Sequence, residues 1–207
     1  MESDRMSNVN LPPNRSKFWP LKISLRWLLI LVTIACVWLG RHVRRADQQR
    51  KAIDKVSTLG GWIRYDYQLQ NGKFIPASDS KIPQYVRDIF GHDFFHSVVE
   101  VSFVYSDDSG TREDNENRSE LSLEMLSGLP NLKRIYFCGE QINDRNIKHV
   151  SQLKNLERFY AWDAADLTDK GVTHLKPLRK LQDIHIGKSN LTDESLKTLS
   201  NIPNCKI

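Results

Sequence analysis

The sequence predicts an α/β fold in which short parallel strands alternate with helices, preceded by an apolar N-terminal helix and a hairpin-containing cap. Three observations lead to this prediction. Apolar residues recur from residue 126 onward with a period of 24 or 25, as Leu129, Leu153 and Leu178 illustrate. Within each period they alternate at first and are then spaced by three, which indicates a strand followed by a helix. Near the N-terminus, residues 27–40 carry no charge.

The uncharged segment WLLILVTIACVWLG is 14 residues long, which is short for a membrane span. Apolar residues precede it, and Lys22 and Arg26 can extend their methylenes along the helix while their charges reach the headgroups, giving about 20 usable residues. Tryptophans near both ends favour the membrane interface: Trp19, Trp27 and Trp38. We therefore expect a single-pass membrane protein with a signal-anchor helix.

Two other interpretations of this segment receive less support. A cleaved secretory signal needs a small-x-small site, but Val37-Trp38-Leu39-Gly40 and then Arg41 follow the apolar run. Thr33 to Cys36 resembles a lipoprotein cleavage box only weakly, because three further apolar residues follow the cysteine. Basic residues are nearly balanced on the two sides, so the side of the membrane that the repeats face stays open.

The net charge of +5 is unevenly distributed. Residues 1–51 contain ten basic and three acidic residues, a net +7, which leaves −2 for the rest of the chain. The basic excess therefore surrounds the apolar segment and does not form a nucleic-acid-binding surface on the C-terminal part. We expect no nucleic-acid partner.

Residues 60–97 are predicted to form an N-terminal cap over the repeats. Gly60-Gly61 is typical of a helix end. Residues 62–74 alternate around Asn71-Gly72, which is the strongest short hairpin signal. Residues 83–90 are expected to form a short helix.

The expected organisation places the repeats after this cap, beginning with a strand at residues 98–103. A polar, charged loop is inserted before the first full repeat. The predicted parts are a basic tail over 1–20, a transmembrane helix over 21–43, a juxtamembrane helix over 44–59, the cap over 60–97, and the repeats over 98–207 with the inserted loop at 106–119.

Three segments form the repeats: residues 126–149 (first unit), 150–174 (second unit) and 175–198 (third unit). Each has a strand of the Leu-x-x-Ile-x-Phe type, a turn and a helix. The helix starts are predicted at Asn143-Asp144, Thr168-Asp169 and Thr192-Asp193, because each pair supplies a capping side chain and then an acid that suits the helix dipole.

These residues resemble the leucine-rich repeat family, and most closely its bacterial membrane-anchored members with the consensus L-x-x-L-x-x-L-x-L-x-x-T-x-I-T-D-x-G-L. The resemblance covers about residue 98 to the C-terminus. It departs at the consensus threonine, which is replaced here by Glu140, Ala165 and Ser189, and the consensus glycine occurs only as Gly171. The resemblance implies ribonuclease-inhibitor-like α/β repeats stacked as a short solenoid, with parallel strands on the concave side and helices on the convex side.

Residues that would support catalysis or metal binding are not recognisable. The sequence has no P-loop, dinucleotide fingerprint, His-Glu-x-x-His or zinc-type cysteine pair. Cys138 and Cys205 are about three repeats apart, roughly 14 Å at the usual strand spacing, and should not form a disulfide. His149 and His174 occupy equivalent positions in two units, which explains them better than a metal does. We expect no enzyme activity, no cofactor, no metal and no small-molecule substrate.

The candidate binding residues lie between the buried positions of each strand, where stacking would bring them into rows. Tyrosine, tryptophan and arginine dominate binding hot spots because they contribute large areas and directed hydrogen bonds. The predicted concave-face residues are Arg134, Tyr136, Arg158, Tyr160, Trp162, Asp183 and His185.

We expect a protein or peptide ligand to contact the aromatic residues, with Arg134 and Arg158 binding its carboxylates. A purely structural spacer of the cell envelope is the alternative, since β propensity alone can place aromatic residues on a sheet. A substrate-recruiting adaptor of the F-box-like type is a weaker alternative, because no such segment precedes these repeats.

Overall fold

The computed structural model describes residues 24–70, 73–75, 80–103, 123–138, 142–203 and 205–206. The chain divides into an N-terminal part, Met1–Trp38, and a C-terminal part, Leu39–Ile207, which are described separately. The predicted basic tail over residues 1–20 and the predicted loop over 106–119 lie outside the described residues.

Helix α1 (Leu25–Thr58) begins in the N-terminal part of the chain and is 34 residues long. Its apolar part is long and apolar enough to cross a membrane, and none of the side chains in that window is buried. A signal sequence near the N-terminus would satisfy the same criteria. The predicted transmembrane and juxtamembrane helices are therefore parts of one continuous helix.

The C-terminal half of α1 packs within the C-terminal part of the chain through Gln49, Ala52 and Val56, which are buried. The Gln49 side-chain amide donates to the His96 carbonyl (2.8 Å), and its oxygen accepts from the Val98 amide (3.2 Å). These two bonds connect α1 to the segment that enters the central sheet. The helix ends at Thr58, and two residues later Gly60 has a φ of 68°, a conformation that glycine adopts without strain.

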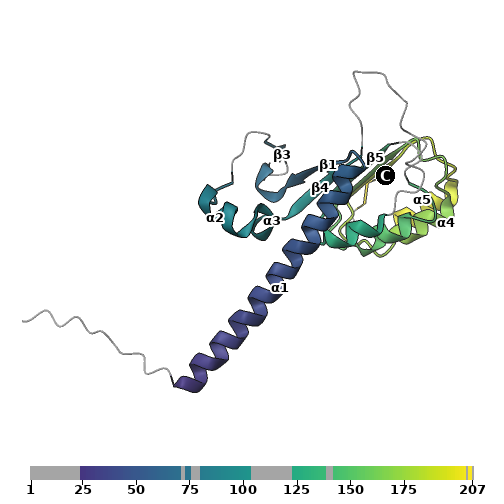
Figure 1. Ribbon diagram of the computed structural model, residues 1–207. Helices are drawn as coiled ribbons and strands as arrows, with labels where there is room; N and C mark the ends of the chain where they lie inside the picture. The colour runs from purple at the N-terminus through teal and green to yellow at the C-terminus, as the bar shows by residue number, and fades with distance from the viewer. Residues whose placement is uncertain are drawn as a thin grey trace, which may run out of the picture. The chain divides into compact units, whose positions relative to one another are not determined.

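The central sheet has five strands in the order β1-β4-β5-β6-β7 (Figure 1). Strand β1 is antiparallel to β4, and the remaining pairs are parallel. The strands are β1 (Trp62–Tyr65), β4 (Val98–Ser102), β5 (Arg134–Cys138), β6 (Arg158–Trp162) and β7 (Asp183–Ile186). The mostly parallel α/β arrangement agrees with the fold class expected from the sequence.

The predicted hairpin over residues 62–74 forms only in its second half. Strand β2 (Leu69–Gln70) pairs with β3 (Lys73–Phe74), while β1 joins the central sheet instead. The 3-10 helix η1 (Asp66–Gln68) separates them, and its first amide donates to the Ser97 carbonyl, which turns the chain away from the sheet. The predicted turn at residues 71–72 lies outside the described residues.

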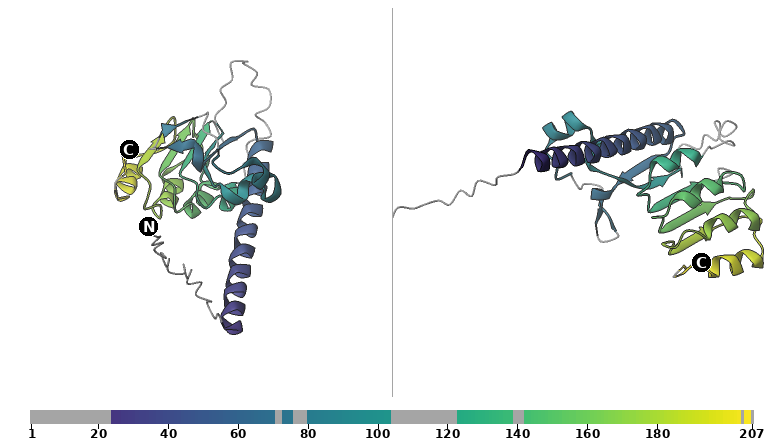
Figure 2. Two further views of the ribbon diagram at one scale, coloured as in Figure 1. Left: turned by 90° about the vertical axis from the view of Figure 1, so that its left-hand side faces the viewer. Right: turned by 90° about the horizontal axis from the view of Figure 1, so that it is seen from below.

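Short helices connect the strands, and those of the three units lie along one side of the sheet (Figures 1 and 2). A period of 24 or 25 residues leaves room for only one or two helical turns between a strand and its successor, and several of these turns adopt the tighter 3-10 geometry. The helices are α2 (Gln84–Phe90), α3 (His92–Phe95), η3 (Leu123–Gly128), η4 (Ile147–Gln152), α4 (Asp169–Val172), η5 (Thr173–Leu175) and α5 (Asp193–Ser200).

One core lies between the sheet and these helices, and equivalent positions of successive units fill it. Ile135, Phe159 and Ile184 from the strands are at most 5% exposed. Val150, Leu175 and Leu199 from the helices are at most 2% exposed. Because strand residues alternate between two faces, burial of this set leaves the intervening residues on the other face of the sheet.

Candidate functional site

The seven predicted binding residues occupy the face of the sheet opposite the helices, which is called the open face below. The register places Arg134 beside Arg158 and Arg158 beside Asp183. It likewise aligns Tyr136, Tyr160 and His185 in a second row, and Trp162 lies beside Cys138. The structure therefore brings all seven residues onto three adjacent strands: Arg134, Tyr136, Arg158, Tyr160, Trp162, Asp183 and His185.

The aromatic residues of the open face stack on one another. The rings of Tyr136 and Tyr160 are nearly parallel, with 4.9 Å between centroids. Trp162 lies 5.6 Å from Tyr160 and 6.3 Å from Tyr136, again nearly parallel. His185 extends the group at 6.1 Å from Tyr160. Such contacts hold the rings in fixed orientations, so little rotamer entropy remains to be lost on binding.

The stacked rings of the open face differ in exposure. Trp162 is 37% exposed and His185 is also exposed, whereas Tyr136 and Tyr160 are half-buried. A stacked ring has less of its face free for a nucleic-acid base than an isolated ring.

Charged side chains adjoin the aromatic stack. Arg158 Nε lies 2.9 Å from Asp183 Oδ2 at the start of two neighbouring strands. The two partners are about one-third exposed, 38% and 30% of their side chains, so both remain within reach of a ligand. A partly exposed pair of this kind contributes little to stability.

Arg134 differs from Arg158 because it is buried against Glu100, which occupies the neighbouring position on β4 and was not among the predicted binding residues. Its Nη1 atom lies 3.5 Å from Glu100, and Glu100 also accepts from Arg64 Nη1 at 2.5 Å. Arg64 in turn lies over the rings of Trp62 and Phe74. Pairing of Arg64 with Glu100 could have been anticipated only with the β1–β4 register, which the hairpin prediction obscured.

Burial raises the pKa of Tyr136, and the negative charge of Glu100 raises it further. The hydroxyl of Tyr136 is therefore protonated throughout the physiological range and can donate a hydrogen bond. The stack presents neutral donors beside the Arg158–Asp183 pair.

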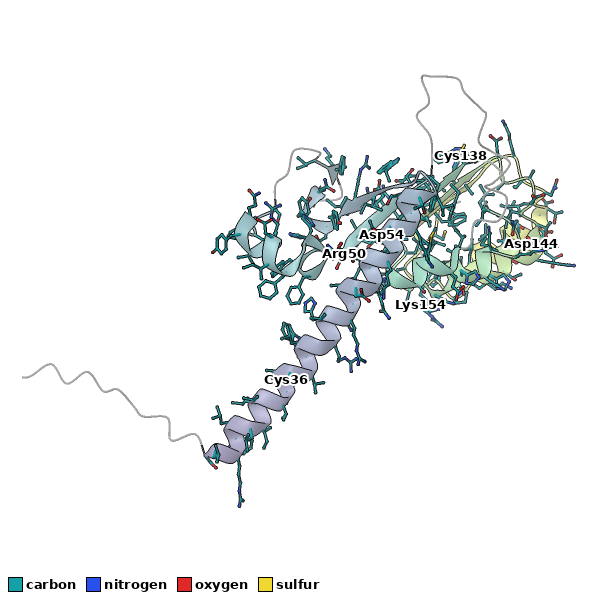
Figure 3. All side chains as sticks on the ribbon, viewed as in Figure 1. Cys36, Arg50, Asp54, Cys138, Asp144 and Lys154 are labelled. Atoms are coloured by element: carbon teal, nitrogen blue, oxygen red, sulfur yellow. The ribbon has the colours of Figure 1, made fainter. Side chains whose placement is uncertain are left out.

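A second set of contacts joins successive repeat units through their aspartates. From the sequence, these aspartates were expected only to interact favourably with the dipole of the helix that follows. Asp144 of the first unit accepts hydrogen bonds from the Thr168 amide (2.9 Å), the Thr168 hydroxyl (2.6 Å) and the Gly171 amide (3.1 Å) of the second. Figure 3 labels Asp144 on the side of the short helices. Gly171 is required here because a Cβ atom would overlap the Asp144 carboxylate and lie 2.6 Å from Leu167.

The same contact recurs one unit later. Asp169 accepts from the Thr192 amide (2.9 Å), the Thr192 hydroxyl (2.6 Å) and the Ser195 hydroxyl. Both threonines also cap the helix that follows them, as the sequence predicted. Hydrogen bonds from the Ser195 and Thr192 hydroxyls lower the pKa of Asp169.

The cap contains a further polar cluster around His96. Its Nε2 atom lies 2.6 Å from the Ser80 hydroxyl, and its Nδ1 atom lies 3.1 Å from Asp66. The Ser80 hydroxyl also accepts from the Ile82 amide (3.2 Å). The cluster thus connects three segments of the cap.

No group of three or more potential metal ligands occurs in the part of the chain that the structure describes. Cys36, Cys138 and Cys205 form no disulfide bond in the described part of the chain. His149 and His174 belong to no such group among the described residues.

Comparison with models of protein families and with curated proteins finds no match for the chain. The described residues define a mixed α/β protein with a mostly parallel sheet, and among them one helix is long and apolar enough to span a membrane.

Proposed function

We propose that the chain is a membrane-anchored leucine-rich repeat protein, and that it binds a protein or peptide through its open face without catalysing a reaction. The observation that carries the binding proposal is the pre-ordered stack of Tyr136, Tyr160 and Trp162 beside the Arg158–Asp183 pair. Aromatic residues held rigid at the centre of a surface are typical of binding hot spots.

The solenoid interpretation is supported by contacts that recur with the sequence period. Parallel strands pair at equivalent positions in the three units, and the aspartate contact is repeated from unit to unit. In a solenoid successive units share one apolar core, and equivalent positions of the three units contribute to the core here, which supports this interpretation.

The bound segment would lie across β5 to β7, with its apolar side chains against the rings of Tyr160 and Trp162. A carboxylate on the ligand would meet Arg158, and a basic group would meet Asp183. Arg134 contributes less than the sequence predicted, because its 8% exposure and its position beside Glu100 leave it little room for a ligand.

The test uses the full chain reconstituted in lipid nanodiscs. Partners captured by photo-crosslinking from Tyr160 would be titrated against the wild type and the Tyr160→Ala and Trp162→Ala variants. We expect each variant to weaken binding by about 10-fold or more, a hot-spot effect of roughly 1.4 kcal/mol or more. Tyr85→Ala is the matched control, because Tyr85 is a 69% exposed aromatic residue outside the open face.

Unchanged affinity in both open-face variants, with circular dichroism showing an intact fold, would reject the open face as the binding site. In that case the structural-spacer alternative would gain support, since it requires no specific surface. Loss of binding in the Tyr85 variant alone would move the site to the cap.

One observation favours a different function class, acyl transfer at Ser80. The Ser80–His96–Asp66 chain has the connectivity of a catalytic triad, in which the hydroxyl proton passes to the histidine as the oxygen attacks a carbonyl carbon. The Ile82 amide, however, donates to the hydroxyl itself, which is the geometry of a serine-stabilised turn. We therefore assign the cluster to cap stability.

A fluorophosphonate probe distinguishes these two roles. We expect no labelling of the full chain in nanodiscs, and the Ser80→Ala variant serves as the control. Labelling that is lost in both the Ser80→Ala and His96→Asn variants would establish a nucleophilic serine and overturn the assignment of the chain as a non-enzyme.

A further inference from the structure

Helix α2 of the cap exposes its apolar side and partly buries a charged residue of its polar side. At about 100° per residue, Tyr85, Ile89 and Phe90 fall within one arc of the helix, and Arg87 and Asp88 fall outside it. A helix that packs on a water-soluble core normally buries its apolar arc. Here Tyr85 is 69%, Ile89 73% and Phe90 54% exposed, whereas Arg87 is only partly exposed and its Nε atom is buried. The orientation of α2 is therefore the reverse of that expected in water.

The exposed surface formed by Tyr85, Ile89 and Phe90 is called the α2 face below. Among the described residues, these three are the most exposed large apolar side chains outside α1. Tyr85 and Ile89 are four residues apart and therefore lie beside one another on the helix surface, and Phe90 adjoins Ile89. A contiguous apolar patch of this kind marks an interaction surface.

The α2 face continues onto helix α1 through a row of aromatic rings. The ring of Phe90 lies 5.4 Å from that of Phe94 on α3, and Phe94 stacks on His42 of α1 with 4.6 Å between centroids. The Gln49 side chain of α1 also donates to Asp93 of α3 (3.0 Å), so α3 is held against α1 (Figure 1). These contacts connect the α2 face to one position on α1.

The composition of α1 changes at that position. Residues 27–39 carry no charge and are exposed, and three exposed arginines follow them, which are called the basic segment below: Arg41, Arg44 and Arg45. In a membrane-spanning helix such a change marks the level of the lipid headgroups, where aromatic rings are also favoured. His42 lies within the basic segment, so the rings that continue from it are at the level of the headgroups.

We propose that the α2 face inserts into the interface of the lipid bilayer in which α1 is anchored. Ile89 and Phe90 reach the outer part of the acyl chains, and the Tyr85 hydroxyl stays among the headgroups. The basic segment contacts lipid phosphates, to which its charge is complementary. Lipid in place of water then surrounds the apolar arc, which accounts for the orientation of α2. The inference rests on the membrane anchoring proposed above, but it is independent of ligand binding at the open face.

The test measures the depth of position 89 in the bilayer. An environment-sensitive fluorescent amino acid replaces Ile89 in the full chain, which is reconstituted at one copy per nanodisc, and lipids brominated along their acyl chains quench it. We expect quenching at a depth of about 5 to 10 Å into the headgroup and acyl-chain boundary, as for interfacial amphipathic helices. The same amino acid in place of Leu196, a 51% exposed residue of α5, is the matched control and should not be quenched.

A third position separates failure of this inference from failure of the anchor. The fluorescent amino acid in place of Ile30 should be quenched within the acyl chains, because α1 spans the bilayer in the proposed function. Quenching at position 30 without quenching at position 89 would overturn the α2 face as a lipid contact and leave the anchor intact. Absence of quenching at both positions would overturn the anchor and, with it, this inference.

A charge placed in the α2 face tests whether apolar contact with lipid holds it in the bilayer. Tyr85→Glu should reduce the quenching at position 89 by about 3-fold or more, whereas Tyr85→Phe should preserve it. Tyr85 is 69% exposed, so both variants should remain folded, which circular dichroism checks. Equal quenching in the two variants would overturn the α2 face as a docking surface.

A protein occupant would give a different result. Emission from position 89 that shifts to shorter wavelength without quenching by brominated lipid would show that protein covers the α2 face, and would overturn the lipid assignment. If this shift required two copies per nanodisc, the occupant would be a second copy of the chain.

Discussion

The second and third units follow the same pattern of residues but differ in what surrounds them. Val172 of the second unit is completely buried, whereas Leu196 of the third is half exposed. Asp169 accepts three hydrogen bonds, whereas its equivalent Asp193 accepts none from the described residues. In a stacked architecture, therefore, the burial of a residue depends on the unit that follows it as much as on its own position in the pattern.

The largest expected effect separates two leucines of these units. Leu175→Ala should lower the free energy of unfolding by about 2 to 5 kcal/mol, because Leu175 is 0% exposed and its loss leaves a cavity. Leu196→Ala should change it by about 0.5 kcal/mol or less, as expected for an exposed side chain. Urea unfolding followed by circular dichroism measures both. Equal losses would show that Leu196 is covered in solution.

A smaller effect is expected at the aspartates between units. Asp144→Ala should cost about 1 to 3 kcal/mol, since it leaves the Thr168 and Gly171 amides without their acceptor in a half-buried site. Asp193→Ala should be nearly neutral by the same unfolding assay. If Asp193→Ala proves as destabilising as Asp144→Ala, the carboxylate of Asp193 already has a partner.

Gly171 tests how closely the units approach. Gly171→Ala should destabilise by about 1 to 3 kcal/mol, because the added Cβ atom would overlap Asp144 and lie 2.6 Å from Leu167. Gly187→Ala is the control, since its Cβ atom would meet nothing closer than Trp162 Cδ1 at 3.8 Å. Thermal unfolding should show a lowered midpoint only for the Gly171 variant.

The period, the strand positions and the threonine caps could be predicted because they follow from local patterns of apolar and capping residues. Thr168 and Thr192 cap their helices as expected. The pairing of β1 with β4 could not be predicted, because the alternation of residues 62–74 is equally compatible with a local hairpin. The side-by-side alignment of Tyr136 and Tyr160 required only equal spacing in two units.

The burial of Arg134 and the role of the aspartates depend on contacts between residues distant in sequence. The strand predicted at residues 98–103 is β4 and lies beside β5 as expected, whereas the ion pair of Glu100 with Arg134 and the burial of Arg134 are seen only in the structure. Similarly, an aspartate after a threonine satisfies the sequence criterion for a helix N-terminus whether or not a further unit accepts its contact. Sequence periodicity identified the units, and only the structure shows how each unit joins the next.

The smallest effect concerns the pH dependence that Asp169 contributes to stability. Hydrogen bonds from the Ser195 and Thr192 hydroxyls lower the pKa of Asp169 below its usual 3.8. A carboxyl group whose pKa is lower in the folded state stabilises the fold above its unfolded-state pKa, and this contribution is lost as the pH falls through the lowered folded-state value. The stability of the wild type should therefore decline below about pH 4, and Asp169→Asn should reduce this decline. Urea midpoints compared between pH 3 and pH 6 measure this decline. An equal decline in the wild type and in Asp169→Asn would show that the hydrogen bonds to Asp169 do not stabilise its carboxylate.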